Sequence, residues 1–187
     1  FRRMAAPEVG GITYPARARD GYADDLLSGL DVDAIRARSF KIVIDYGYSA
    51  ASFVLPLLLG PLGVEAVASH TFRPDQPTAD APTLNELVGQ TKRLVSAVGA
   101  DLGVVFDRAA ERLYLIDDQA REIPVEQALL LYLRLISSNG RRGKLAFPVT
   151  VTSQVDRLVQ DSPLEVVRTP ASLAALTKAA SENGVIF

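Results

Sequence analysis

The feature of this sequence that most constrains its fold is a regular alternation of short apolar runs with longer segments of helical periodicity. The first run, Lys41–Asp45, is rich in β-branched residues, and Ser49–Leu59 after it has the length and the apolar face of a helix. Thr83 and Glu86 have the spacing of a capping box, which predicts that the next helix begins there and continues to Val98. Short loops between strands and helices are typical of an α/β domain around a largely parallel sheet.

The alternation of strand and helix patterns continues to the end of the chain. An apolar face formed by Tyr22, Leu26 and Leu30 predicts a helix ahead of the first strand, with Asp20 as its N-cap. Further strands are expected at residues 64–69, 102–106, 113–116, 144–147, 164–168 and 185–187. Further helices are expected at residues 124–136, 153–160 and 171–181, the first of them with Pro124 at its first helical position.

Glycine and small polar residues gather in the segment from Ser137 to Gly143, which favours a linker between two domains. The chain opens on Phe1 and stops on an apolar run that ends at Phe187, so we read both ends as cuts from a longer protein. Each domain is expected to have three layers and a mixed, mostly parallel sheet. We expect a connector at residues 1–19, a first α/β domain at 20–138 and a second, incomplete α/β domain at 139–187.

Composition excludes several classes of function. The net charge of −2 over 187 residues, with basic residues spread along the chain, gives no positive stripe for a nucleic-acid backbone. The longest apolar run is interrupted by Pro56, Gly60 and Pro61 and is too short to cross a membrane. The chain has no cysteine, which removes disulfides, thiolate metal ligands and a catalytic cysteine, and we expect a cytoplasmic protein.

The segment with the most chemical information runs from Gly99 to Leu113. It begins with Gly-Ala-Asp-Leu-Gly, continues through an apolar strand and reaches Asp107, with Arg112 closing the loop. It resembles the segment of α-D-phosphohexomutases, the phosphoglucomutase and phosphomannomutase family, in which a buried strand leads to a D-G-D-x-D-R loop. In that family the three Asp carboxylates hold Mg²⁺, a hard ion that prefers oxygen ligands, and the Arg belongs to the active site.

The loop of this chain departs from the family pattern. Arg108 stands in place of the Gly, Ala109 in place of the second Asp, and Glu111 in place of the third. Asp107 and Glu111 are the remaining candidate metal ligands, and Arg108 adds a charge whose repulsion at about 4 Å is roughly 4 kcal/mol per unit-charge pair. We expect a degenerate loop without bound Mg²⁺, in which the two acids form a solvated ion-pair loop with Arg108 and Arg112. Metal binding by Asp107 and Glu111 is the alternative.

Three other segments resemble landmarks of the same family. Lys41–Ala51 is similar to the strand, turn and helix that open the second domain, with Tyr48-Ser49 in place of the usual Asn-Gly or His-Gly pair. Pro82–Leu87 resembles the start of a P-x-x-x-N-L helix, and Val125–Leu130 resembles a GDQLLAL helix. The resemblance covers residues 20–187, which correspond to domain two and most of domain three of the family.

A fourth segment, from Val166 to Ser172, is similar to the family's V-x-R-T-P-V-G-x-K loop, which helps to choose the sugar. The resemblance implies a sugar-phosphate loop formed by Arg168, Thr169, Pro170 and Ser172. Ser172 replaces the Gly of that pattern, and its Lys has no counterpart here. A hexose phosphate is therefore the ligand that the resemblance implies for this loop.

A serine and a histidine near the first strand raise the hypothesis of an α/β-hydrolase active site. The sequence Gly47-Tyr48-Ser49 lies between a strand and a helix, like a nucleophile elbow. A triad of that type runs Ser, acid, His, whereas His70 precedes both Asp107 and Asp117. We therefore interpret Ser49 as a helix N-cap and His70 as a partly buried structural histidine.

Small-molecule binding near the first strand has two interpretations. Gly47 is the one glycine of a G-x-G-x-x-G pattern after this strand, so a dinucleotide is not expected. Tyr46 and Tyr48 either line a cleft at the carboxyl edge of the sheet or pack against a neighbouring domain, and we favour packing.

The family resemblance implies a role in sugar-phosphate metabolism. The altered loop, together with Gly10–Pro15, resembles the mutase-like C-terminal region of bacterial mannose-1-phosphate guanylyltransferase-type proteins. We expect a non-catalytic phosphohexomutase-like module of a sugar-nucleotide-forming protein. Its expected partners are neighbouring domains of the parent chain, a hexose phosphate or a second copy of the chain. The alternatives are a fragment of an active mutase that interconverts hexose 1- and 6-phosphates, and an interaction scaffold with no ligand.

Overall fold

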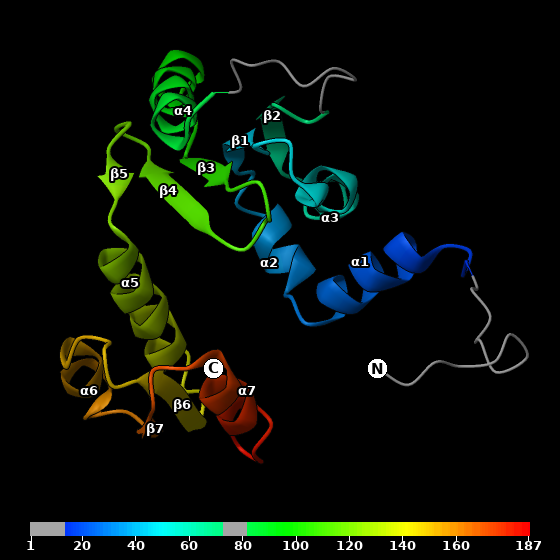
Figure 1. Cartoon of the computed structure of the whole chain (residues 1–187). Coiled ribbons are helices and arrows are strands. Elements are labelled where there is room, and N and C mark those ends of the chain that lie inside the picture. Colours follow the sequence, from blue (N-terminus) through cyan, green and yellow to red (C-terminus); the bar gives the residue numbers. More distant parts are fainter. Residues whose placement is uncertain (1–13, 73–81) are drawn as a thin grey trace, which may run out of the picture. The chain divides into compact units, whose positions relative to one another are not determined.

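The computed structural model describes residues 14–72 and 82–187. The chain divides into two compact units, Phe1–Ala120 and Arg121–Phe187, which are described separately (Figure 1). Most of the expected connector at residues 1–19, including Gly10–Thr13, lies outside the described residues.

The first unit is built on a mixed sheet in the order β2-β1-β3-β4. Its strands are β1 (Lys41–Asp45), β2 (Glu65–Ser69), β3 (Leu102–Phe106) and β4 (Leu113–Asp117). β1 is parallel to both of its neighbours and pairs Ile44 with Ala68 of β2 and with Val104 of β3. β4 runs antiparallel to β3, which gives the mixed, mostly parallel sheet that the sequence predicts.

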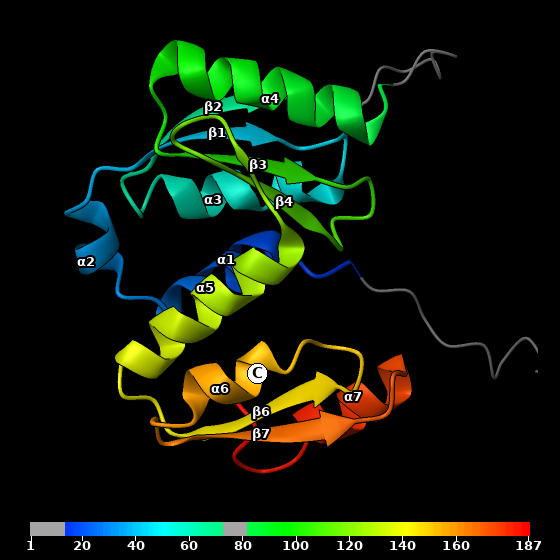
Figure 2. The same cartoon turned by 90° about the vertical axis from the view of Figure 1, so that its left-hand side faces the viewer.

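Helices cover both faces of this sheet, so the unit has three layers. Figure 2 shows α4 (Leu84–Val98) on one face and α3 (Leu55–Leu59) on the other. The capping box that the sequence predicts at Thr83 and Glu86 is present at the start of α4. The apolar side of α4 packs on the sheet in a core formed by Val43, Leu87, Val88, Val95, Ala100, Val105 and Ile116.

One expected helix of the first unit is divided, and one helix is added. The helix expected at Ser49–Leu59 is divided into a 3₁₀ turn at Ala50–Phe53 and the short α3, because Pro56 lacks the N–H that a continuous helix needs. The helix α2 (Val32–Arg36) has no counterpart among the expected elements. Its N-cap is Asp31, whose side chain accepts a hydrogen bond from the amide of Ala34 at 3.0 Å.

The start of the first helix also differs from the expectation. α1 covers Ala18–Ser28 and follows Arg17, which has a left-handed backbone with φ 60°. Asp20 was expected as the N-cap, and this prediction is wrong, because Asp20 already lies inside the first turn. Its carboxylate instead accepts a hydrogen bond from Arg17 Nε at 3.2 Å.

The second unit contains the parallel strands β6 (Gly143–Pro148) and β7 (Leu164–Thr169). Lys144 forms a further parallel bridge with Val185, and Ala146 donates its amide to the carbonyl of Phe187 at 2.7 Å. The end of the chain therefore runs beside β6, but it forms an isolated bridge at Val185 and not the strand expected at 185–187. The helices of this unit are α5 (Val125–Ser138), α6 (Gln154–Val159) and α7 (Leu173–Ala180).

The division between the units lies earlier in the chain than the expected boundary at residues 138 and 139. Leu133 and Ile136 of α5 are buried in one core with Val155 and Val159 of α6, which places α5 in the second unit. The linker composition of residues 137–143 instead marks the turn between α5 and β6. Pro124 is the N-cap of α5, one position before the place expected for it.

Candidate functional site at the carboxyl edge of the first sheet

The parallel strands β1, β2 and β3 end at one edge of the first unit's sheet. Ligands of open α/β sheets bind outside the carboxyl ends of the strands, so a binding site is expected at this edge. The strands end in Asp45, Ser69 and Phe106, and each is followed by a polar or glycine-containing turn.

A buried carboxylate lies at the centre of this edge. Asp45 is 0% exposed. Its Oδ2 accepts a hydrogen bond from Ser69 Oγ at 2.9 Å and lies 2.7 Å from Nδ1 of His70. Its Oδ1 accepts the backbone N–H of Gly47 at 2.9 Å. Because a carboxylate only accepts hydrogen bonds, Nδ1 of His70 carries the proton and Nε2 is left for another partner.

The turns that surround Asp45 have an unusual backbone. Gly47, Tyr48 and His70 have φ values of 53°, 59° and 48°, in the left-handed region that non-glycine residues rarely adopt. The amide of Tyr48 donates to the carbonyl of His70 at 2.9 Å, and the two rings meet edge to face with centroids 4.9 Å apart. The two turns are therefore joined by the side chain of Asp45 and by this backbone contact.

The turn after β1 also rests directly on the end of β3. A Cβ atom at Gly47 would lie 2.4 Å from the carbonyl oxygen of Phe106, so no larger residue fits without displacing backbone. The rings of Tyr46 and Phe106 are stacked with centroids 6.0 Å apart. Burial raises the pKa of the Tyr46 hydroxyl. Tyr46 thus packs inside the first unit, whereas the sequence favours packing against a neighbouring domain.

Ser49 follows the turn and stands at the start of the 3₁₀ segment, as expected from its position after β1. Its side chain makes no capping hydrogen bond, however, and its Oγ has no hydrogen-bond partner among the described residues. The residue is only 2% exposed. Ser49 is therefore a buried hydroxyl at the start of the segment, and capping is not its structural role.

The loop expected to hold a metal is a tight turn between β3 and β4. Oδ1 of Asp107 accepts the backbone amides of Glu111 and Arg112 at 2.8 and 3.1 Å. The amide of Ala110 donates to the carbonyl of Asp107 at 3.0 Å, and Ala110 itself has a φ of 57°. The turn is thus closed by hydrogen bonds between the carboxylate of Asp107 and amides of the same loop.

This turn does not fit a three-carboxylate Mg²⁺ site. One oxygen of Asp107 is already shared by two amides, and Ala109 supplies no side-chain oxygen. Across residues 14–72 and 82–187, no group of three His, Cys, Asp or Glu side chains is placed to hold a metal ion. The described residues also show no ion pair that joins Arg108 or Arg112 to the two acids. The turn is instead held by backbone amides that donate to the carboxylate of Asp107.

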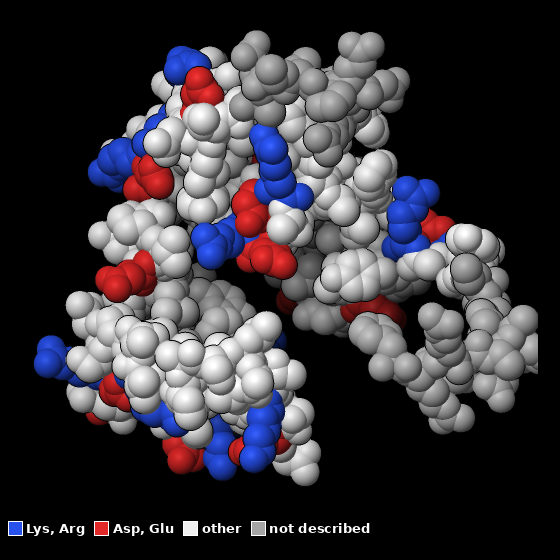
Figure 3. All heavy atoms as spheres, viewed as in Figure 1, with Lys and Arg blue, Asp and Glu red and all other residues white. Residues whose placement is uncertain are grey.

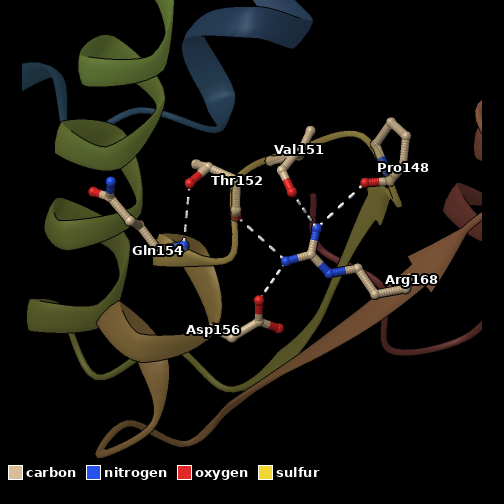
Figure 4. A network of polar contacts seen from close by, with 6 residues as sticks. All are labelled: Pro148, Val151, Thr152, Gln154, Asp156 and Arg168. Atoms are coloured by element: carbon tan, nitrogen blue, oxygen red, sulfur yellow. Dashed lines mark hydrogen bonds and ion pairs between the residues drawn. The ribbon is translucent and has the colours of Figure 1, made fainter.

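The predicted sugar-phosphate loop follows β7 in the second unit. Figure 4 shows that the guanidinium of Arg168 points toward the loop after β6 and toward Asp156 of α6. Its Nη1 donates to the carbonyls of Pro148 and Val151 at 3.3 and 2.9 Å. Its Nη2 donates to the carbonyl of Thr152 at 3.4 Å and forms an ion pair with Asp156. Arg168 therefore fastens the loop after β6 to β7.

The remaining residues of this predicted loop also have local partners. Thr169 is buried, and its Oγ1 donates to the carbonyl of Pro170 at 3.2 Å. Ser172 is the N-cap of α7, and its Oγ accepts the amide of Ala175 at 3.2 Å. The structure brings Arg168, Thr169, Pro170 and Ser172 to one strand end, and sugar-phosphate binding by them stays a prediction.

Sequence reasoning missed the central residue of the first unit's edge. From the sequence, Asp45 is only the last residue of a β-branched run, and His70 is a partly buried structural histidine. A signal was available, since Asp45 follows a run of β-branched residues and cannot be buried without partners. Its partners come from the end of another strand, which the sequence does not place beside it.

An open cleft of about 740 Å³ lies beside this edge and is formed entirely by the first unit. His70 stands at one side, and α4 supplies most of the other residues. The lining residues are His70, Pro82, Asn85, Glu86, Gly89, Gln90 and Arg93. The cleft thus opens onto the imidazole that Asp45 orients.

The charged residues of the surface are mixed in sign. Figure 3 shows blue and red side chains interspersed on the face of the molecule that it presents. Among the described residues, no helix combines the length and the apolar character that crossing a bilayer requires.

The fold and this edge define an α/β/α domain with an open, mostly parallel sheet. The family model for phosphoglucomutase/phosphomannomutase, alpha/beta/alpha domain II, matches residues 20–120. Since the match spans more than half of the 187 residues, the protein belongs to the phosphoglucomutase/phosphomannomutase family. The family resemblance inferred from the loop at Asp107 is confirmed.

Sequence relatives extend the similarity over the whole chain. A "Probable phosphoglucosamine mutase" of Methanothermobacter thermautotrophicus is 31% identical over 189 residues, which cover 100% of this chain and 39% of that protein. A "Phosphoglucomutase/phosphomannomutase" of Thermococcus kodakarensis is 29% identical over 185 residues, which cover 98% of this chain and 40% of that protein. The chain thus spans about two fifths of the length of these curated relatives.

A solved structure supports the fold. A phosphoglucomutase/phosphomannomutase family protein of Burkholderia thailandensis matches with a TM-score of 0.71 and 21% identity, over 89% of this chain and 36% of that one. The α/β architecture expected from the alternation of strands and helices is therefore confirmed.

Proposed function

We propose that this chain is a phosphohexomutase-like module of a protein of sugar-phosphate metabolism, and that its β3–β4 turn does not serve phosphoryl transfer. The observation that carries the proposal is the state of Asp107. Its carboxylate closes the turn on the amides of Glu111 and Arg112, while Ala109 offers no ligand. A Mg²⁺ ion would have to compete with these hydrogen bonds and would gain at most one further carboxylate.

The parent protein in this proposal handles a hexose phosphate on the way to a sugar nucleotide. We assign this parent to the mannose-1-phosphate guanylyltransferase type because the altered turn resembles the mutase-like region of such proteins. The family membership and the relatives named as mutases support the sugar-phosphate part of the proposal. The non-catalytic part is supported by the residues of the turn.

An active mutase is the second candidate. The relatives are named phosphoglucosamine mutase and phosphoglucomutase/phosphomannomutase, and this chain covers about two fifths of their length. In that case Asp107 and Glu111 would provide a weak metal site, with other groups supplied by the rest of the protein. A module that binds no ligand and serves assembly alone is the third candidate.

A magnesium titration distinguishes these candidates. We expect the wild-type chain to show no saturable Mg²⁺ binding below about 1 mM by calorimetry, the weak limit of carboxylate sites. The variant Arg108→Gly/Ala109→Asp/Glu111→Asp restores the family pattern and should bind at least about tenfold more tightly, because it gains a carboxylate and loses a positive charge.

The control for this titration is the same triple variant with Asp107→Asn. It keeps the restored acids and removes the carboxylate at the first position, so it should lose the gained affinity. Saturable Mg²⁺ binding by the wild-type chain at sub-millimolar concentration, together with mutase activity of the full-length parent, would overturn the non-catalytic proposal.

A further inference from the structure

The open cleft beside His70 and α4 has no part in the proposed role of the β3–β4 turn. None of its lining residues belongs to the segment 107–112. Five of its lining residues carry polar side chains: two amides, an imidazole, a guanidinium and a carboxylate. A cleft of this composition recognises a ligand through hydrogen bonds and charge.

Most of the hydrogen-bonding capacity in the cleft is unused. In the described part of the chain, Asn85, Gln90 and Arg93 have no polar side-chain partner. Glu86 is different, because its carboxylate accepts the amide and the hydroxyl of Thr83 at 2.7 and 2.9 Å. The unused groups are therefore the guanidinium of Arg93, which only donates, and two side-chain amides, each of which offers an NH₂ donor and an oxygen acceptor.

His70 adds an oriented ring to these groups. The contact of 2.7 Å between its Nδ1 and Oδ2 of Asp45 fixes the ring and leaves Nε2 without a partner among the described residues. With Nδ1 donating to Asp45, Nε2 of the neutral ring can accept a hydrogen bond from an O–H of the ligand, such as the hydroxyl of hydrogen phosphate. The side chain is 19% exposed, which keeps it accessible from the cleft.

Gly89 lies in the interior of α4 and lines the cleft. A glycine inside a helix costs about 1 kcal/mol relative to alanine, so its presence needs a reason. Close packing is not that reason among the described residues, since a Cβ atom there would meet only Arg93 Nη1 at 3.9 Å. The missing side chain keeps the space beside the guanidinium open.

We propose that this cleft binds a small oxyanion, either a phosphate or a carboxylate, between the guanidinium of Arg93 and the imidazole of His70. Asn85 and Gln90 donate further hydrogen bonds, and Gly89 lets the ligand approach the helix. The ionised Glu86 opposes the anion and limits its affinity. This site is separate from the β3–β4 turn, and its existence does not depend on whether that turn holds a metal.

The test is a titration of the full chain with inorganic phosphate and, in parallel, with malonate, followed by ¹H–¹⁵N NMR. We expect saturable shifts at the amides of Gly89 and Gln90 and at the side-chain nitrogens of His70 and Arg93. If only one anion saturates the site, the ligand belongs to the class of that anion, phosphate or carboxylate. If both do, the site binds the oxyanion group that the two classes share. No saturable shift with either anion would overturn the proposal.

Variants show whether the shifts belong to this site. Arg93→Gln should weaken binding about tenfold or more, since it removes a charge-assisted hydrogen bond. Gly89→Leu, which leaves every charge in place, should block the cleft to a similar extent. Glu86→Gln should tighten binding by removing the opposing charge.

Arg112→Gln is the matched control, because it removes an arginine from the β3–β4 turn and should leave the affinity unchanged. Equal affinity of the wild type and Arg93→Gln would show that the anion binds elsewhere, and so would a loss of binding in Arg112→Gln. Because Arg93 is an exposed residue on a helix, its substitution should leave the fold intact, and the NMR spectrum reports this directly.

Discussion

Nδ1 of His70 lies 2.7 Å from Oδ2 of Asp45, and this contact joins the end of β2 to the end of β1 beneath the surface of the first unit. The same carboxylate holds Ser69 Oγ and the amide of Gly47, so three donors from two turns converge on one buried acid. A buried charge is tolerated only when it is satisfied in this way. Asp45 therefore organises the edge from which the cleft opens.

Replacing Asp45 with Asn tests this role. The variant keeps the size of the side chain, but in either orientation its NH₂ group faces at least one of the three donors. We therefore expect a loss of about 2 kcal/mol in the free energy of unfolding. Urea denaturation measures the change. The NMR signal of the His70 ring should also broaden or move, because Nδ1 loses its acceptor.

The matched control is Asp101→Asn. The Oδ2 of Asp101 also accepts a backbone amide, that of Lys41 at 2.8 Å, but the residue is exposed and an Asn oxygen can replace that acceptor. We expect a loss well below that of Asp45→Asn. Equal losses for the two variants would mean that burial of Asp45 and its three donors add nothing.

The sequence predicts the elements of the first unit better than the site at their ends. β1 and α4 follow from local patterns: a β-branched run in one case and a capping box with an apolar stripe in the other. The cluster at Asp45 depends on Ser69 and His70, which are distant in the chain and meet only because β1 and β2 are parallel neighbours. No local pattern in one sequence reports such a meeting.

Gly47 provides a second prediction. Its φ is 53°, and a Cβ atom would lie 2.4 Å from the carbonyl oxygen of Phe106. Gly47→Ala should therefore cost about 2 kcal/mol or more, since left-handed strain and a backbone clash add together. Urea denaturation measures the loss.

Gly21→Ala is the comparison for this variant. Gly21 lies within α1, and a Cβ atom there has no described neighbour within 4 Å. The substitution should stabilise the chain by up to about 1 kcal/mol, because alanine is the better helix former. If both alanine variants changed stability in the same direction, the close approach of Gly47 to β3 would not be the cause.

The pH dependence of stability should reveal the capping box of α4. Hydrogen bonds from the amide and the hydroxyl of Thr83 lower the pKa of Glu86 below its usual value of 4.5. A lowered pKa means that the folded state favours the carboxylate. The stabilisation is therefore complete above the unfolded pKa and is lost as the pH falls through the folded pKa.

Thermal unfolding of the wild type and of Glu86→Gln between pH 7 and pH 3 measures this effect. We expect the wild type to have the higher melting temperature at neutral pH and the difference to shrink below about pH 4.5, where the unfolded carboxylate binds a proton. A difference that stays constant across the range would show that the charge of Glu86 makes no contribution to the cap.

The directions of the side chains in the two predicted loops could not be predicted from the sequence. The substitutions at Arg108, Ala109 and Glu111 indicate a changed metal loop, but they do not show that Asp107 turns inward to accept two amides. In the second unit, a family pattern suggests a ligand for Arg168, whereas the structure gives its guanidinium four acceptors from its own unit. Side-chain direction is set by tertiary neighbours that a linear pattern does not contain.

The contacts of Arg168 lead to the last prediction. Its two terminal nitrogens bridge the carbonyls of Pro148, Val151 and Thr152 to the carboxylate of Asp156 (Figure 4). A lysine carries the same charge but cannot span this set, because its donors radiate from one nitrogen. Arg168→Lys should lower the free energy of unfolding of the second unit by about 1–3 kcal/mol.

Hydrogen exchange separates a local effect of this variant from a global one. The amide of Val151, which donates to the carbonyl of Pro148 at 3.0 Å, should exchange faster when the loop after β6 is released. Arg157→Lys is the control, since Arg157 is an exposed residue of α6 and its replacement should change stability by no more than about 0.5 kcal/mol. If Arg168→Lys left both stability and exchange at the control level, the guanidinium would be free to face a sugar phosphate, and the ligand role that the family pattern implies would regain its support.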